Sequence, residues 1–249
     1  FANRDEIVLA SKLYFPMFDG PNAKGLSRKS IFAEIDHSLK RLQTDYLDLY
    51  IIHRWDYGTP IEETMEALHD LVKMGKVRYI GASSMHAWQF AKAQFIAEKN
   101  GWTKFVSMQN LYNLLYREEE REMIPLLQDQ NVAMTPWSPL AGGRLTRDIG
   151  AITARASQAV QADLPAYIVA SDNEVISRVH KLADERGITR GQVATAWMLS
   201  KDYVTAPLIG ATKVNYLDDA LGAFEVALSA EEIKYLEEAY VPRNITGYR

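Results

Sequence analysis

Polar and aromatic side chains follow six short apolar runs of this sequence, each where the run ends. They are Lys12, His53, Ser83 with Ser84, Gln109 with Asn110, Trp137 with Ser138, and Gly210 with Thr212. A lysine and a histidine at adjacent run ends could tune a proton transfer, because the cation lowers a neighbour's pKa while the imidazole bonds to the same oxygen. An indole could stack on a flat ring, and the serine and amide side chains could hold a carboxamide.

Each of these side chains also has an ordinary structural explanation. A lysine that ends a strand is commonly solvated, and a lone histidine there is commonly a satisfied structural residue. Ser83 and Ser84 could cap the helix that begins near Ala87, and Trp137 could plug the end of a barrel. No histidine pair has the spacing of a metal site. The complete set favours a ligand site, since every run ends in such a group.

The apolar runs predict buried parallel strands, because apolar residues follow one another instead of alternating. The runs are Glu6–Ser11, Tyr46–Ile52, Val77–Ala82, Phe105–Gln109, Val132–Trp137 and Val204–Gly210. Amphipathic segments lie between them: Ile31, Ile35, Leu39 and Leu42 share one helical face, with Ser27 or Ser30 as its cap. The remaining predicted helices cover 61–74, ending near Gly75, and 87–99, 119–129, 174–186, 190–201, 214–223 and 230–239.

Alternating strands and helices without a break in composition predict one α/β domain over residues 1–249. Six strands suit a doubly wound sheet, whereas a closed β/α barrel needs eight. No G-x-G-x-x-G follows the first strand, so the main signature of a dinucleotide-binding doubly wound fold is absent from the sequence. The stretch 141–171 is predicted to be a surface excursion with a functional role.

Composition excludes several classes of protein. The net charge is -4 and there is no dense basic block, which argues against nucleic-acid binding. No apolar stretch approaches the ~18 residues of a membrane helix, and the chain has no cysteine for disulfides or thiolate metal sites. The compartment is not marked by cysteine chemistry, so a cytoplasmic location is the default expectation. Composition leaves the oligomeric state open.

Six segments together resemble one family. They are VLASK, DYLDLYIIHRWD, TPIEETMEALHDLVKMGKVRYIGASS, SMQNLYNLLYRE, PWSPLAGGRLT and PLIGATKVNYLDDAL, which run from the start of the chain almost to its end. In this order they resemble the aldo-keto reductase superfamily, and within it the bacterial-type branch related to potassium-channel β-subunits. The resemblance implies a (β/α)8 TIM-type barrel that binds NADPH and reduces aldehydes or ketones by hydride transfer. The expected partner is therefore a small-molecule carbonyl substrate.

The resemblance also implies a role for each matched residue. Lys12 resembles the family's pKa-lowering lysine and His53 its carbonyl-orienting histidine, and Trp137 resembles the aromatic residue stacked on nicotinamide. The implied carboxamide ligands are Ser83, Ser84 and Gln109; the implied pyrophosphate ligands are Ser138, Leu140 and Arg144 or Arg147; and the implied adenosine 2′-phosphate ligands are Gly210, Thr212 and Lys213, with Asp219 near the adenine. Tyr216 and Ala220 depart from the commonest pattern, so NADH is not excluded.

The family's first two strands, its catalytic aspartate and its general-acid tyrosine precede the segment that matches VLASK. Only FANRDEI stands there in this sequence, so we expect about six of eight strands, with the first two β/α units, roughly 60 residues, missing. Loss of a general acid lowers turnover by about 10²–10⁴-fold. The alternative function is therefore a non-catalytic nicotinamide-nucleotide-binding or interaction protein. A Schiff-base enzyme using Lys12 is a third alternative, but it leaves Trp137 and GATK unexplained.

Overall fold

The computed structural model describes residues 3–151, 169–211 and 213–248. These residues divide into two compact units. The first unit contains residues 3–109, 126–132 and 248, and the second contains residues 110–125, 133–151, 169–211 and 213–247.

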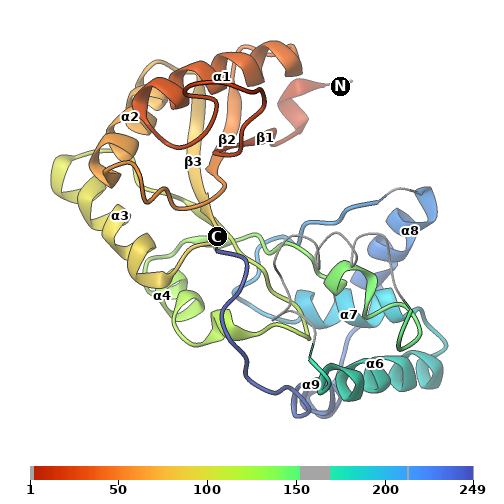
Figure 1. Ribbon diagram of the computed structural model, residues 1–249. Helices are drawn as coiled ribbons and strands as arrows, with labels where there is room; N and C mark the ends of the chain where they lie inside the picture. The colour runs from red at the N-terminus through yellow and green to blue at the C-terminus, as the bar shows by residue number, and fades with distance from the viewer. Residues whose placement is uncertain (1–2, 152–168, 212, 249) are drawn as a thin grey trace. The chain divides into compact units, whose positions relative to one another are not determined.

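The first unit is a parallel sheet joined by helices. Its strands β1 (Ala10–Leu13), β2 (Leu47–Ile52), β3 (Val77–Ser83) and β4 (Ser107–Gln109) pair in chain order, each parallel to the next. The helices α1 (Arg28–Leu42), α2 (Ile61–Lys73) and α3 (Ala87–Asn100) connect successive strands (Figure 1). α1 packs against α2, and α2 packs against α3. Such a succession of strand, helix and parallel strand is the repeating unit of a β/α barrel.

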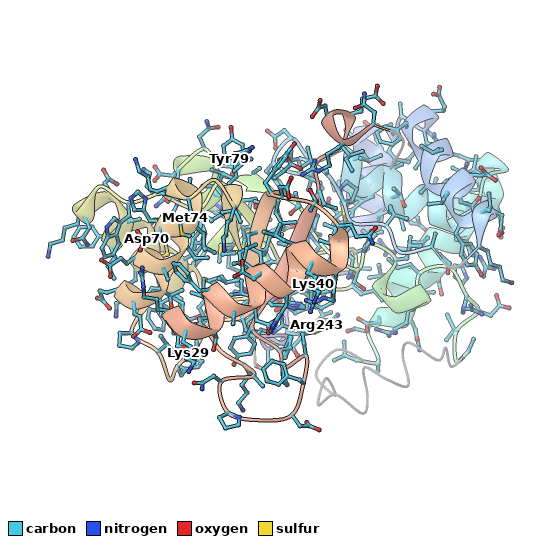
Figure 2. All side chains as sticks on the ribbon, turned by 90° about the horizontal axis from the view of Figure 1, so that it is seen from above. Lys29, Lys40, Asp70, Met74, Tyr79 and Arg243 are labelled. Atoms are coloured by element: carbon cyan, nitrogen blue, oxygen red, sulfur yellow. The ribbon has the colours of Figure 1, made fainter. Side chains whose placement is uncertain are left out.

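Local sequence sets the ends of these helices. The Ser27 side chain accepts a hydrogen bond from the Ser30 backbone N–H and so caps α1. Gly75, just beyond α2, has a φ of +74°, a conformation that glycine adopts without cost. Apolar residues of both helices are buried against the sheet, while Figure 2 shows the labelled side chains on their other surface, Lys29 and Lys40 from α1 and Asp70 from α2.

The second unit is mainly helical. It contains the 3-10 helices η2 (Glu118–Glu120), η3 (Ala141–Gly143) and η5 (Ala223–Glu225), the short strand β5 (Ala133–Met134), and the helices α6 (Asp172–Arg186), α7 (Arg190–Leu199), α8 (Val214–Gly222) and α9 (Ala230–Glu237). α6 packs against α7 and α9, and α7 packs against α8 (Figure 1). The helix α4 (Met123–Asp129) has residues in both units.

A buried polar contact fixes the core of the second unit. The rings of Trp197 and Tyr112 lie 5.3 Å apart and are fully buried. Trp197 Nε1 donates a 2.8 Å hydrogen bond to Glu237 Oε1, which also pairs with Lys201. The indole therefore has its polar partner, and α7 is tied to the end of α9.

Seven of the eight predicted helices are confirmed within the described residues, whereas 119–129 is divided into η2 and α4. The predicted strands Phe105–Gln109 and Val132–Trp137 are shorter in the structure, as β4 and β5, and two other predicted strands are wrong in part. The first run, Glu6–Ser11, begins instead with the 3-10 helix η1 (Arg4–Glu6), and β1 starts only at Ala10. Asp48 explains the shift, because its side chain accepts the 2.8 Å hydrogen bond of the Leu9 N–H and also pairs with Arg4. A contact distant in the sequence thus overrides the local apolar pattern.

The sixth predicted strand, Val204–Gly210, is reduced to a single bridge between Val204 and Met134. Thr205 N and Leu208 N still donate hydrogen bonds to the carbonyls of Met134 and Pro136. Pro136 and Pro207 have no N–H to continue the ladder, which explains why neither segment forms a longer strand. Five strands are assigned in the described part of the chain, instead of the six predicted.

Of the predicted excursion 141–171, residues 141–143 form η3, and residues 152–168 lie outside the described residues. None of the helices in the described ranges has the length and apolar character to span a membrane.

Candidate active site and cofactor site

The strand register of the first unit places the candidate residues on one face of the sheet. Lys12 pairs with Ile51, Ile51 with Gly81, and Gly81 with Ser107, so these four residues form one row across β1 to β4. Ser83 pairs with Gln109 two residues further along. His53 lies two residues beyond Ile51, and because side chains alternate between faces, it falls on this same face.

A glycine makes room inside the first row. A Cβ atom added to Gly81 would lie 2.4 Å from Ser107 Oγ and 3.3 Å from the Ser107 carbonyl oxygen. Ser107 is buried, and its hydroxyl has no hydrogen-bond partner among the described residues. Gly81 is therefore required by the close approach of β4. Ser83 and Gln109 lie two residues further along the strands, whereas Lys12 lies in the same row as Gly81.

His53 is half-buried beneath an aromatic side chain of the loop after β1. The Phe15 ring meets the imidazole edge to face, with centroids 4.9 Å apart. Burial lowers the pKa of His53 to about 4, and the positive charges of Arg54 and Lys12 act in the same direction. The imidazole is therefore neutral at pH 7, with one ring nitrogen as a donor and the other as an acceptor.

Lys12 is the second candidate catalytic residue. Burial, and then the charge of Arg54, lower the pKa of its ammonium group. The effect of Arg54 arises because Lys12 and Arg54 lie at the carboxyl ends of the neighbouring strands β1 and β2. An ammonium group in such a place can stabilise negative charge that develops on a nearby oxygen.

Ser83, Ser84 and Gln109 come together at the ends of β3 and β4. Ser83 Oγ donates a 2.6 Å hydrogen bond to the Gln109 carbonyl oxygen and lies 3.1 Å from Ser84 Oγ. Ser84 has a φ of +49°, an uncommon conformation for a non-glycine residue that recurs at functional sites. The Gln109 residue is only 5% exposed, and its side-chain amide makes no hydrogen bond with a described residue.

In the second unit, Trp137 and Ser138 begin a tight turn after β5. Ser138 has a φ of +63°; its carbonyl accepts from the Ala141 N–H and from Asn113 Nδ2, and its Oγ accepts from the Gly142 N–H. Two amides of the turn are thus already satisfied by Ser138. Leu140, the third predicted residue of this segment, precedes η3 and is partly exposed.

The two predicted arginines of this segment have different surroundings. Arg144 pairs with Asp172 at 2.7 Å, and Asp172 also binds Arg243, which is 4% exposed. Asp172 itself is completely buried. Arg147 is exposed, and its backbone bonds to His180. By binding both arginines, the Asp172 carboxylate anchors the start of α6.

The predicted phosphate residues lie around the start of α8. The Leu208 N–H bond to the Pro136 carbonyl (2.9 Å) brings this segment beside the Trp137 turn. Gly210 and Lys213 are exposed, and Lys213 is the N-cap residue of α8, without a side-chain capping bond. Asp219 lies on α8 and is partly exposed. Thr212 lies outside the described residues.

Comparison with known proteins identifies the family of this chain. The family model described as the aldo/keto reductase family matches residues 2–241. The chain belongs to the aldo/keto reductase family.

Similar aldo/keto reductases occur in fungi. An aldo-keto reductase of Alternaria alternata is 49% identical over 243 residues, covering 96% of this chain and 66% of the relative. A versiconal hemiacetal acetate reductase of Aspergillus parasiticus is 44% identical over 265 residues, covering 97% and 76%. A Schizosaccharomyces pombe protein that carries the provisional name of an aryl-alcohol dehydrogenase is 46% identical over 271 residues, covering 98% and 75%. The narrower resemblance to the potassium-channel β-subunit branch stays a prediction.

Two residues of this aldo/keto reductase that contact His53 were not among the candidates predicted from the sequence. Arg54 Nη1 donates a 2.6 Å hydrogen bond to the His53 carbonyl, and Phe15 packs on the imidazole. A signal for both is present in the sequence: Arg54 directly follows His53, and aromatic residues are dense in the segment YFPMF after Lys12. Loops that follow barrel strands commonly carry ligand contacts, so both positions qualified as candidates.

Proposed function

We propose that this aldo/keto reductase is an oxidoreductase that uses NADPH to reduce aldehydes or ketones to alcohols. The supporting observation is the neutral His53 on the same sheet face as Lys12, Ser83 and Gln109. The names of the fungal relatives, two reductases and an alcohol dehydrogenase, point to the same class of reaction. The chain is proposed to form most of a single β/α barrel domain.

The residues of the carboxamide site fit a nicotinamide. Gln109 offers a nearly buried primary amide without a described partner, and a second primary amide complements it, donor to acceptor and acceptor to donor. Ser83 and Ser84 supply hydroxyls beside it. The remaining cofactor residues are proposed from the family resemblance alone: Trp137 for the nicotinamide ring, Ser138, Leu140, Arg144 and Arg147 for the pyrophosphate, and Gly210, Thr212, Lys213 and Asp219 for the adenosine part.

The cofactor, when bound, supplies a hydride to the carbonyl carbon. Before that step, the neutral His53 ring donates a hydrogen bond to the carbonyl oxygen and holds it in place. The Lys12 ammonium group would stabilise the negative charge that builds up on that oxygen, and water would supply the proton that completes the alcohol. A protonated His53 would add a third cation beside Lys12 and Arg54, and the low pKa of the imidazole keeps the ring neutral at pH 7.

The experiment is to measure NADPH binding and NADPH oxidation separately. Tryptophan fluorescence follows binding, and absorbance follows oxidation with an aromatic aldehyde as the carbonyl compound. Binding with aldehyde-dependent oxidation supports the proposed function. Binding without oxidation, even at high protein concentration, supports the alternative of a non-catalytic nicotinamide-nucleotide-binding or interaction protein. If neither NADPH nor NADH binds, both functions fail.

A further inference from the structure

Arg54 occupies a central place at the end of β2. Its Nη1 donates a 2.6 Å hydrogen bond to the His53 carbonyl, and its guanidinium carbon lies 5.4 Å from the centre of the Phe15 ring. Its Nε is buried and has no hydrogen-bond partner among the described residues. The guanidinium group therefore lies beside the imidazole that we assign to the carbonyl, with part of its donor capacity unused.

No carboxylate in the described residues pairs with Arg54. The acid of its loop, Asp56, accepts hydrogen bonds from other groups. Its Oδ2 accepts from Leu26 N and Thr59 Oγ1, and its Oδ1 accepts from Gly58 N. These bonds join the loops after β1 and β2. Within the described ranges, the two cations Lys12 and Arg54 thus lie beside His53 without an ion pair to a carboxylate.

Other poorly exposed arginines of this protein, unlike Arg54, form ion pairs with carboxylates. Arg117 binds Glu120 and Glu237, Arg243 binds Asp172, and Arg144 shares that carboxylate. A cation held partly out of water without an anion is costly. Where the fold retains such a cation beside a reactive group, an anionic ligand is the ordinary reason.

We propose that Arg54 binds a carboxylate group of the substrate, so that the preferred substrates are oxo acids or formyl-substituted aromatic acids. This inference rests on the proposed function, because it takes the substrate carbonyl to lie at His53. The planar guanidinium fork matches a carboxylate in geometry and charge. Phe15, which contacts both His53 and Arg54, provides an apolar surface for the carbon atoms between the two groups.

The test compares two ligands of nearly equal shape, 4-formylbenzoate and the neutral 4-formylbenzamide, by calorimetry in low salt. A charge-assisted hydrogen bond predicts about 10–100-fold tighter binding of the acid to the wild type. Arg54→Gln should remove this preference while leaving the amide affinity unchanged, and Arg54→Lys should retain part of it as a point charge. Arg78→Gln is the matched control, since Arg78 is an exposed arginine of β3 stacked on Tyr46; it should keep the wild-type preference.

Three results would overturn the inference. They are equal wild-type affinity for acid and amide, failure of both ligands to bind, and equal loss of both in Arg54→Gln. Weaker NADPH binding in Arg54→Gln, measured by tryptophan fluorescence, would also overturn it by assigning the residue to the cofactor. Ligand binding is measured without turnover, so the two claims can be tested separately. If the acid and the amide bind equally but both aldehydes are reduced with similar kcat/KM, the inference fails and the proposed function stands. Absence of NADPH binding would instead refute the proposed function.

Discussion

The neutral state of His53 can be tested by titration. With its pKa lowered to about 4, about 0.1% of the imidazole is protonated at pH 7, compared with about 24% at the ordinary value of 6.5. Because burial is the largest cause and the charge of Arg54 the next, variants should separate the two. Phe15→Ala, which opens the imidazole to solvent, should raise the pKa of His53 more than Arg54→Gln does.

The same shift predicts how stability depends on pH. Between about pH 6.5 and about pH 4 the unfolded chain binds a proton at His53 that the folded chain does not, so acidification in this window lowers the free energy of unfolding. The shift corresponds to at most about 3 kcal/mol, and solvent access to the half-buried ring reduces this to roughly 1–2 kcal/mol. Above pH 6.5 the contribution is constant. The difference between wild type and His53→Gln isolates it from other groups, including His180, whose pKa burial also lowers.

The assay is a proton NMR titration of the histidine ring signals, with His53→Gln used to assign the resonance. One of the five histidines should titrate near pH 4. Urea unfolding at pH 7 and pH 5 should show a smaller loss of stability in His53→Gln than in the wild type. A His53 resonance that titrates at or above pH 6 would refute the reasoning, since burial and two neighbouring cations would then have no effect on the ring.

Three further predictions concern other parts of the molecule. Asp172→Asn leaves two arginines without their buried carboxylate and should cost about 3–5 kcal/mol of unfolding free energy, whereas Asp148→Asn, at an exposed ion pair, should change urea unfolding little; equal effects would contradict the assignment. Gly81→Ala should cost about 1–3 kcal/mol by overpacking, and adding Ser107→Ala should recover most of it, because the clash is with the Ser107 hydroxyl; no recovery in the double variant would be inconsistent with that cause. Lys213→Ala should weaken NADPH binding by about tenfold and leave NADH binding unchanged, and equal losses would argue against a 2′-phosphate contact.

Local sequence patterns predicted the helices well, because capping residues and apolar periodicity act within one or two turns. Ser27 caps α1 and Gly75 follows α2 as expected. The strands were less predictable, since their ends depend on distant partners. Asp48 captures the Leu9 N–H and delays β1, and Pro207, which has no N–H to donate, limits pairing after Val204.

Candidate site residues could be predicted from the sequence where their position at the end of a strand determines which end of the sheet they occupy. The rule that ligands meet the carboxyl ends of strands selected Lys12 and His53, and the register confirms that their side chains share a face. The role suggested for Arg54 was not visible in the sequence, because it depends on which carboxylates are committed elsewhere in the fold. The pairing of Arg144 with Asp172 is likewise a long-range contact that no local pattern announces.

The most direct test of the proposed function is NADPH oxidation by the purified protein with an aromatic aldehyde, wild type against His53→Ala. The wild type should oxidise NADPH only when aldehyde is present and form one alcohol for each NADPH consumed. His53→Ala should lower kcat while the Kd for NADPH stays unchanged. A protein that binds neither NADPH nor NADH, or an unchanged kcat in His53→Ala, would contradict this account.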